Sequence, residues 1–252
     1  MNNKEISMEV NMEIKKVGRR GTLFTFYDLG IPTNVYVINA KQHVYILDTY
    51  LGPDIMKLVN QYINDQYGNK QVIVVNSHSH WDHVWGNSFF SSNIIISHEL
   101  CKKYMEQDGL EALEEYKEYK KGDVALAYPN LTFTDKICFE EDKVLIYHTP
   151  GHTDDEISII DLVDKVLFAG DNLERPIPYL ISKDIGQYIK TLEDYLSIDV
   201  QIIIGGHTNC EDKNLIQDNL DYVKKVLIGN TAEFEKGEYA QYHKTNMEGL
   251  YE

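Results

Sequence analysis

Histidine and aspartate residues gather in one short segment of the sequence. The segment Asn-Ser-His-Ser-His-Trp-Asp-His places His78, His80, Asp82 and His83 within six residues. It follows the β-branched run 71–75, which predicts a buried strand. A strand end is a rigid platform, and the loop beyond it can bend so that alternate side chains converge. Imidazole and carboxylate groups at this spacing are typical ligands of a metal ion such as Zn²⁺.

Three further segments of strand character also end on a potential ligand. Taken alone, each has an ordinary explanation, because Gly-Asp is a common turn and one histidine after an apolar strand is a weak signal. The three residues are His152, Asp171 and His207, after expected strands at 143–147, 165–168 and 200–204. The Pro-Gly turn before His152 directs it back toward the first segment, whereas His148 precedes that turn and is expected to make a structural hydrogen bond.

Together the four segments supply five imidazoles and two carboxylates, enough for two metal ions that share a bridging ligand. The alternative is a set of polar turns in which these residues stand together by chance. Histidine is rare here, with 9 among 252 residues, so chance explains the first segment poorly. Nitrogen and oxygen ligands without sulfur suit Zn²⁺, and also iron or manganese.

The elements that would position these residues alternate along the chain as in an α/β or α+β domain. Alternation and β-branched runs predict strands at 22–27, 34–39, 43–47, 71–75, 94–96, 143–147, 156–160, 165–168 and 200–204. Apolar periodicity predicts helices at 54–67, 185–196 and 214–227, and a charged helical stretch at 99–121 that Gly109 breaks in two. The polar residues after 227 are expected to cap the fold or fray.

Composition and charge restrict the class of protein. Of the 252 residues 43% are hydrophobic, and 24 basic against 40 acidic residues give a net charge of −16. This charge disfavours nucleic acids and anionic membranes as partners and favours a small-molecule substrate. The cysteines Cys101, Cys138 and Cys210 form no paired motif, which argues against a disulfide framework or a cysteine-rich zinc site. No segment resembles a signal peptide or a membrane span, so a cytoplasmic location is expected.

The motifs as a set resemble the metallo-β-lactamase superfamily of metallohydrolases. Its pattern is His-x-His-x-Asp-His followed by single His, Asp and His positions, and the resemblance covers roughly 22–208. It implies a four-layer αβ/βα sandwich, an α/β (α+β) fold with the metals at one edge between two sheets. We expect a single domain over 1–252, with a helical insertion at about 99–128 and a C-terminal helix and tail at about 213–252.

The resemblance also implies a role for each ligand. His78, His80 and His152 would bind one metal ion, Asp82, His83 and His207 the second, and Asp171 would bridge the two. Asp48 matches a family aspartate that supports the site, although a turn residue at a strand end explains it equally well. The cofactor expected is a pair of divalent ions, with Zn²⁺ first and iron or manganese as the alternatives.

The implied reaction is hydrolysis by a metal-bridging hydroxide, which attacks a thioester, a lactone or a related carbonyl of a small molecule. Asp82 would also carry a proton as a catalytic residue. A bridging aspartate is similar to glyoxalase II-like and lactonase members. The cysteine ligand found in some β-lactamases is absent at Asp171, and the lack of an export signal further disfavours antibiotic hydrolysis.

Two regions are expected to form the substrate walls, 99–128 and 172–182. Within the second, Arg175 would bind a substrate carboxylate and Tyr179 would hydrogen-bond an oxyanion; a surface salt bridge and a packing aromatic are the alternatives. Three other functions stay open: a mononuclear iron enzyme similar to persulfide dioxygenases, a β-lactamase-like amide hydrolase, and a scaffold without activity. The sequence does not indicate an oligomeric state.

Overall fold

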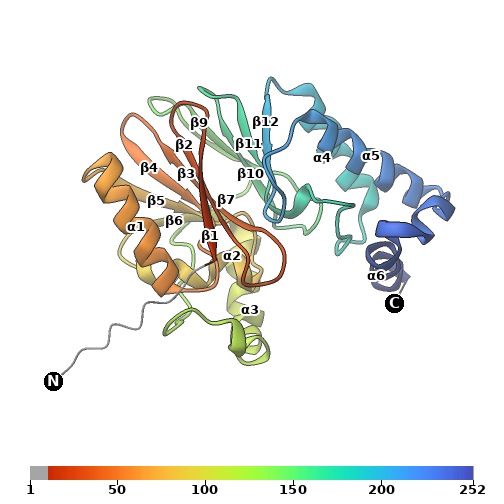
Figure 1. Ribbon diagram of the computed structural model, residues 1–252, viewed down its shortest axis with the longest axis horizontal. Helices are drawn as coiled ribbons and strands as arrows, with labels where there is room; N and C mark the ends of the chain where they lie inside the picture. Colours follow the sequence, from red (N-terminus) through yellow and green to blue (C-terminus); the bar gives the residue numbers. More distant parts are fainter. Residues whose placement is uncertain (1–10, 252) are drawn as a thin grey trace.

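The computed structural model describes residues 11–251 and contains two β-sheets packed face to face between layers of helices (Figure 1). In spatial order, the first sheet contains β1 (Met12–Val17), β2 (Gly21–Phe26), β3 (Thr33–Asn39), β4 (His43–Leu47), β5 (Gln71–Val75), β6 (Ile94–His98) and β7 (Leu131–Phe133). The second contains β12 (Ile202–Ile204), β11 (Val166–Phe168), β10 (Ile157–Asp161), β9 (Val144–His148) and β8 (Lys136–Phe139). The α-helices are α1 (Pro53–Tyr67), α2 (Trp81–Val84), α3 (Glu99–Glu115), α4 (Ile185–Ser197), α5 (Lys213–Leu227) and α6 (Ala240–Tyr251).

The layers follow from which face of each element is apolar. The two sheets bury a shared core between them, to which Ile38 and Leu47 contribute from the first sheet and Ile146 and Phe168 from the second. Helix α1 covers the outer face of the first sheet. Helices α4 and α5 pack on the outer face of the second sheet, on the opposite side of the molecule in Figure 1. The predicted four-layer αβ/βα sandwich is therefore confirmed.

Strand direction brings the ligand-bearing loops to one edge. β11 runs parallel to β12, and β9 and β11 are both antiparallel to β10, so β9, β11 and β12 end at the same edge of the second sheet. The loop after β5 reaches this edge from the first sheet, where the carbonyl oxygen of Ser77 accepts a hydrogen bond from Ile157 N at 2.8 Å. Asn34 of β3 donates its side-chain amide to the carbonyl oxygens of Gly205 and Thr208 in the loop after β12. The two sheets are thus joined by hydrogen bonds directly beside the candidate site.

The structure corrects one expectation about the helices and agrees with another. The break at Gly109 is wrong, because α3 runs continuously from Glu99 to Glu115. A Cβ atom at Gly109 would lie 3.0 Å from Leu126 Cδ1, so close packing of a neighbouring loop explains a glycine that helix propensity disfavours. The C-terminal residues cap the fold, one of the two outcomes expected, since α6 packs Met247 and Leu250 against the cluster formed by α4 and α5.

A buried ion pair joins the two sheets at the end away from the site. Arg20, in the turn between β1 and β2, donates to both carboxylate oxygens of Asp161 on β10 at 2.6 to 3.1 Å and to the carbonyl oxygen of Asp142. Asp161 is fully buried, and only 13% of the Arg20 side chain is exposed.

Removing Arg20 is expected to destabilise the fold substantially. Arg20→Met leaves the Asp161 carboxylate buried without its cation, and we expect the free energy of unfolding to fall by about 3 kcal/mol. Urea denaturation followed by circular dichroism measures this change. Lys41→Met, which breaks the exposed pair with Glu141, should have little effect. Similar losses in the two variants would contradict the prediction.

Within 11–251, no helix combines the length and the apolar character needed to cross a membrane.

Candidate metal centre

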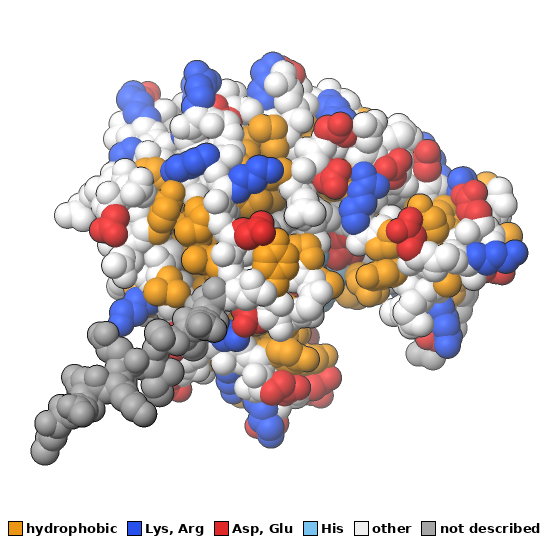
Figure 2. Space-filling model, in the orientation of Figure 1, with side chains coloured by type: hydrophobic (Ala, Val, Ile, Leu, Met, Phe, Trp, Pro, Cys, Tyr) orange, Lys and Arg blue, Asp and Glu red, His pale blue; other side chains and the backbone are white. Residues whose placement is uncertain are grey.

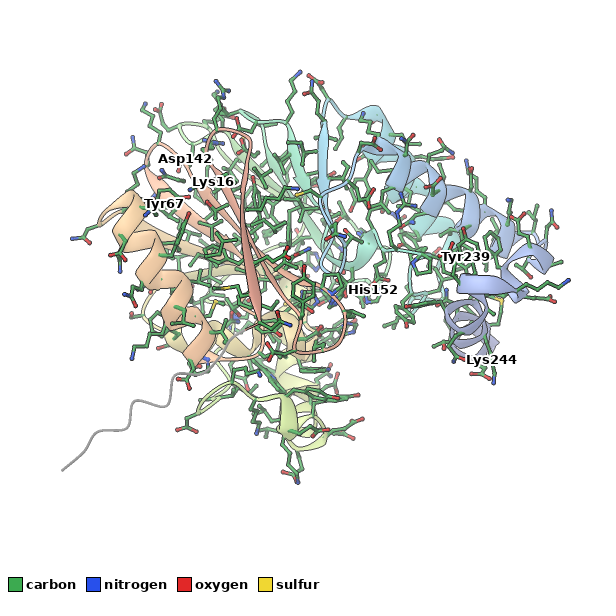
Figure 3. All side chains as sticks on the ribbon, in the orientation of Figure 1. Lys16, Tyr67, Asp142, His152, Tyr239 and Lys244 are labelled. Atoms are coloured by element: carbon green, nitrogen blue, oxygen red, sulfur yellow. The ribbon has the colours of Figure 1, made fainter. Side chains whose placement is uncertain are left out.

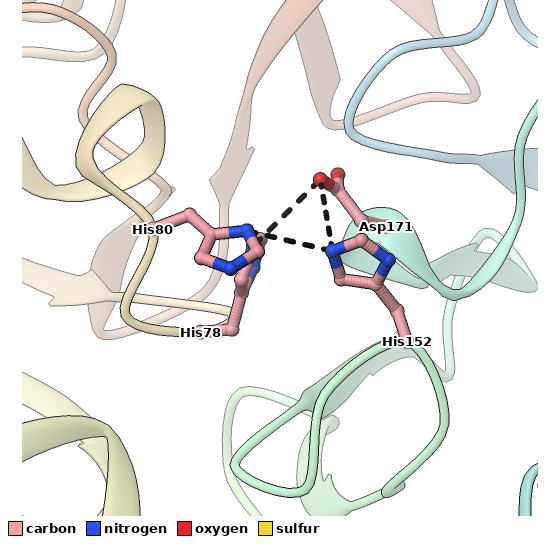
Figure 4. Close-up of side chains that lie close together, drawn as sticks. All are labelled: His78, His80, His152 and Asp171. Atoms are coloured by element: carbon pink, nitrogen blue, oxygen red, sulfur yellow. Dashed lines mark hydrogen bonds and ion pairs between the residues drawn. The ribbon is translucent and has the colours of Figure 1, made fainter. Parts of the chain in front are cut away.

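The seven residues predicted as ligands lie together at the edge where the loops of the two sheets meet. The loop after β5 carries two of them and α2 two more; the loop after β9, the short helix η3 (Gly170–Asn172) and the loop after β12 carry one each. In the same order they are His78 and His80, Asp82 and His83, His152, Asp171, and His207. Figure 4 shows His78, His80 and His152 converging on Asp171, and Figure 3 places His152 between the two halves of the molecule.

The first group consists of His78, His80, His152 and Asp171, whose ligand atoms lie within 4.8 Å of one another. His152 Nε2 is 3.4 Å from His80 Nδ1. Asp171 Oδ2 is 3.6 Å from His78 Nε2 and 3.8 Å from His152 Nε2. The group therefore presents three imidazole nitrogens and one carboxylate oxygen to a single point.

The second group consists of Asp82, His83 and His207. His207 Nε2 is 3.2 Å from Asp82 Oδ2 and 3.3 Å from His83 Nε2. Asp171 Oδ2 also lies 3.4 Å from the Nε2 atoms of both histidines. One oxygen atom of Asp171 thus stands beside both groups, which is the position a bridging ligand requires.

The distances fit metal coordination better than hydrogen bonding alone. Two ligand atoms that are each 2.0–2.1 Å from a tetrahedral metal ion lie about 3.4 Å apart, close to the separations in both groups. Moreover, His78 Nε2 and Asp171 Oδ1 are buried and have no hydrogen-bond partner among the residues that the structure describes. Buried polar atoms without partners are rare in proteins, and a divalent cation would satisfy the nitrogen. The donor set therefore fits such an ion.

Hydrogen bonds to the outer nitrogens fix the orientation of four imidazoles. Asp48 Oδ2 lies 2.8 Å from His83 Nδ1, and Ser77 Oγ lies 3.0 Å from His78 Nδ1. The carbonyl oxygen of Tyr179 lies 3.0 Å from Nδ1 of His152, and Thr33 Oγ1 and the carbonyl oxygen of Pro32 lie 3.2 and 3.1 Å from that of His207. Such partners set the tautomer and direct the free nitrogen inward. Of the two roles considered for Asp48, the one beside the site matches this contact.

Burial and charge set the protonation of the cluster. Burial holds the pKa of His78 well below its usual range and lowers the pKa of His152 to about 4. Burial alone would also lower the pKa of His83, but the carboxylates of Asp171 and Asp82 raise it well above its usual value. Burial would raise the pKa of Asp82, yet His83 and His207 lower it to about 2. The carboxylates are therefore anionic at neutral pH, as metal ligands must be.

Two buried carboxylates near the cluster escaped the sequence analysis. Glu156 accepts a hydrogen bond from Asp171 N at 3.1 Å, and its other oxygen is 3.5 Å from His78 Nδ1. Glu174 is 5% exposed, and its ligand atom lies within 4.8 Å of those of Asp171 and His207. Burial and the charge of Asp171 raise the pKa of Glu174 to about 8. Neither glutamate belongs to a recognisable sequence motif. Acidic residues are common in the chain, so these two do not stand out, and only the fold brings them to the site.

Two glycines, Gly170 and Gly206, directly precede the candidate ligands Asp171 and His207. Their position in the sequence was a signal that other groups of the site pack closely against the backbone there. A Cβ atom on Gly206 would lie 2.1 Å from Asp171 Oδ1 and 2.8 Å from His83 Cε1. Gly170 adopts a φ of +52°, and its Cβ would overlap the Glu156 carboxylate. These glycines allow the loops after β11 and β12 to approach the ligands.

The two predicted substrate-binding residues lie at the rim of the site. Arg175 lines a pocket next to the metal site that also contains Glu174 and His207, and its guanidinium donates to Asp218 at 2.7 Å and to Glu211 at 3.5 Å. Tyr179 lines the cleft with its ring, while its carbonyl oxygen contacts His152. Their substrate contacts stay predictions. His148 lies outside both groups and hydrogen-bonds the carbonyl oxygen of Asp154, as expected.

Asp48→Asn is expected to weaken metal binding while leaving the backbone intact. The Asp48 carboxylate accepts from Ser77 N and Ser77 Oγ as well as His83 Nδ1, and an amide offers one acceptor fewer. Asparagine tolerates the φ of +62° at this position. We expect metal affinity to fall about 10- to 100-fold, measured by competition with a chromogenic chelator.

Asp142→Asn is the matched control for Asp48→Asn. Asp142 is equally buried, and Figure 3 places it far from His152. Its carboxylate binds Gln42 N, His43 and Tyr45 and contacts none of the candidate ligands. This variant should keep the wild-type metal affinity. An unchanged affinity in Asp48→Asn would contradict a role for Asp48 in the site.

The sandwich and the paired His/Asp groups define a class of divalent-metal hydrolases. The model of the metallo-beta-lactamase superfamily matches residues 29–207, and the chain belongs to that superfamily. The chain is 23% identical over 209 residues to the acyl-coenzyme A thioesterase MBLAC2 of Gallus gallus. The matched region covers 73% of this chain and 75% of that protein.

Two further comparisons agree with this assignment. The beta-lactamase-like protein 2 homolog of Drosophila melanogaster is 25% identical over 181 residues, which cover 70% of this chain and 59% of that protein. The structure of DIM-1 metallo-beta-lactamase superposes with a TM-score of 0.71 at 19% identity, over 86% of this chain and 100% of that one. At this identity, the structural likeness supports the fold alone.

Proposed function

We propose that the protein is a binuclear metal-dependent hydrolase that cleaves a small acyl thioester. The observation that carries this proposal is the position of Asp171 Oδ2, 3.4 to 3.8 Å from imidazole nitrogens of both ligand groups. A carboxylate in that position suits two cations rather than one. The absence of sulfur from both groups favours Zn²⁺, with iron and manganese as alternatives.

The chain's own residues would prepare the reaction in three ways. Five histidines and the carboxylates of Asp82 and Asp171 hold the cations, which when bound activate water and polarise the substrate carbonyl. Asp82 contacts His83 and His207 through Oδ2, so its other oxygen, Oδ1, is the atom at which a proton from the attacking water would be held. Tyr179 would donate its hydroxyl to the substrate oxygen from the rim of the cleft.

The cleft over the metal centre favours a carbonyl substrate with apolar parts. Its volume is about 350 Å³, within the range of small-molecule sites. Besides the ligands, its lining contains Leu29, Ile31, Trp81, Tyr116, Tyr119, Glu174, Tyr179 and Ile181. Two relatives named acyl-coenzyme A thioesterases further support a thioester over the lactone alternative.

Charge supports a small, weakly charged substrate over a polyanion. Acidic side chains stand among the basic ones on the face shown in Figure 2. Arg175, in the pocket next to the cleft, is already paired with Asp218 and Glu211. We therefore propose a small-molecule substrate, with neither nucleic acid nor membrane as partner, and a cytoplasmic location.

Turnover of a substrate panel by metal-loaded protein tests the proposal. The panel contains acyl thioesters of a neutral thiol, of glutathione and of coenzyme A, together with an acyl-homoserine lactone, a chromogenic cephalosporin and a phosphodiester. We expect selective turnover of thioesters, lost together with bound metal in His80→Ala. Turnover of the lactone or the cephalosporin alone would overturn the thioester assignment. One bound iron per chain and oxygen uptake on a persulfide would overturn hydrolysis.

A further inference from the structure

A partly open cavity lies beside the metal centre, between α3 and the segment that carries the candidate metal ligands. Its volume is about 120 Å³. Apolar and small side chains form most of its wall: Trp81, Val84, Trp85, Met105, Gly109, Ala112 and Leu126. Ser79, Tyr104 and Asp108 form its polar end, and His80 forms the side toward the site.

His80 connects this cavity to the reaction site. It also lines the cleft that contains Asp82, His152, Asp171 and His207, and it lines an open groove along Tyr104 and Ser182. The outer nitrogen of His80 has no hydrogen-bond partner among the residues described, unlike those of the other four histidines. Its ring is therefore a wall shared by all three spaces, and a group held in the cavity lies next to a substrate at the metal centre.

The cavity walls are fixed rather than loosely packed. Trp81 stacks on Tyr116 with ring centroids 4.7 Å apart and planes 8° from parallel, and it contacts Trp85 on its other side. The hydroxyl of Tyr104 donates to Asp154 at 2.9 Å, which ties α3 to the loop after His152. Helix α3, which projects from the sandwich in Figure 1, forms one wall of the cavity, and the cavity shares Ser79, Tyr104 and Asp108 with the open groove. A partly open apolar cavity with fixed walls beside a reaction site is typical of a small-molecule subsite.

We propose that this cavity binds an aliphatic acyl chain of about six carbon atoms, with the scissile carbonyl on the metal side of His80. The proposal rests on the hydrolase function above and adds its acyl specificity. The size follows because an apolar cavity of about 150 Å³ holds a benzene molecule. Asp108 and Asp154 near the polar end would repel a second carboxylate, so the chain end is uncharged.

The chain's 2 tryptophans, Trp81 and Trp85, provide a direct test because both line the cavity. Linear alcohols from ethanol to decanol serve as neutral chain probes, and tryptophan fluorescence reports their binding. We expect Kd to fall about fourfold per added carbon and to level off near six carbons. A response that does not depend on chain length would overturn the proposal.

Substitutions on α3 connect binding to specificity. Ala112→Phe is designed to fill the cavity. If the phenylalanine side chain prevents folding, Ala112→Leu replaces it with a smaller side chain that still occupies part of the cavity. Leu110→Phe is the matched control, since Leu110 lies on the same helix and is 74% exposed. Filling the cavity should remove the chain-length dependence and lower kcat/KM for a hexanoyl thioester at least about tenfold relative to an acetyl thioester. The control should change neither.

These measurements separate the cavity from the reaction. Chain-length-dependent binding that Ala112→Phe abolishes, without turnover of any panel substrate, would support the cavity and overturn the proposed reaction. Thioester turnover that ignores chain length, and is equal in Ala112→Phe and Leu110→Phe, would overturn the cavity proposal and leave the reaction standing. If the protein hydrolyses only lactones, with the same dependence on acyl-chain length, the result would support the acyl-chain cavity and overturn the thioester as the substrate.

Discussion

Replacing Asp171 by alanine is expected to lower both metal content and activity more than any other single substitution at the site. One of its oxygens lies 3.4 to 3.8 Å from the Nε2 atoms of His78, His83, His152 and His207. The alanine variant leaves each group short of an anionic ligand. Since loss of an outer partner alone costs about 10- to 100-fold, we expect kcat/KM to fall by more than about 100-fold. Metal analysis of the dialysed protein should give at most one ion per chain.

The control for Asp171→Ala is Asp221→Ala, the same chemical change on the exposed face of α5. It should keep two ions and full turnover. Circular dichroism of both variants distinguishes a lost ligand from a lost fold. Two tightly bound ions in folded Asp171→Ala would contradict the bridging role and assign that role to another carboxylate, of which Glu174 is the nearest candidate.

The convergence of the seven candidate ligands was predictable because the geometry around each of them is local. Each ligand follows a strand, and a strand that ends at a fixed edge determines where the next few residues lie. Pro150-Gly151 before His152 and Gly206 before His207 are turn residues beside the ligands, and their chemistry is visible in the sequence. β9 and β11 end at one edge because both pair antiparallel with β10, and β12 ends there too because α4 forms a parallel crossover between β11 and β12.

The outer partners and the walls were not predictable because they depend on contacts between distant segments. Glu156 begins an ordinary strand pattern, and Glu174 stands in a loop without a motif. The helix break expected at Gly109 failed for the same reason. Glycine disfavours a helix locally, but the approach of Leu126, 17 residues later, decides the outcome. β1 was missed because it is an edge strand with four exposed residues, so it lacks an apolar face.

The proposed acyl-chain cavity was also not predictable from the sequence, because its walls are formed by segments that are distant in the chain. Its walls come from α2, α3 and the loop at Leu126, and no sequence pattern indicates that these segments line a cavity together. Trp85, one of the wall residues, is only 2% exposed and packs in the protein core. Burial and a place in the cavity wall are compatible, because a rigid aromatic side chain can support the core with one face and line a cavity with the other.

Removing the metal is expected to lower the melting temperature of the wild-type protein by about 5–10 °C. The site collects five imidazoles and the carboxylates of Asp48, Asp82, Asp171 and Glu156 within a buried edge of the sandwich. Without metal ions, the buried charge of Asp82 and Asp171 is balanced only by imidazoles that must take up a proton, such as His83. A metal at 100 times its Kd stabilises the folded state by about 2.7 kcal/mol, and for a chain of this size each kcal/mol is worth about 2–4 °C.

Thermal unfolding followed by circular dichroism, with excess chelator and after zinc is restored, measures this shift. The increase in melting temperature on adding zinc should be as large in Asp221→Ala as in the wild-type protein. It should be nearly absent in Asp171→Ala, because only this variant has lost the shared ligand. A wild-type protein that binds two zinc ions yet melts at the same temperature with and without them would bind metal equally well when unfolded. That result would contradict a preformed site, since the candidate ligands lie on four separate segments that only the folded sandwich brings together.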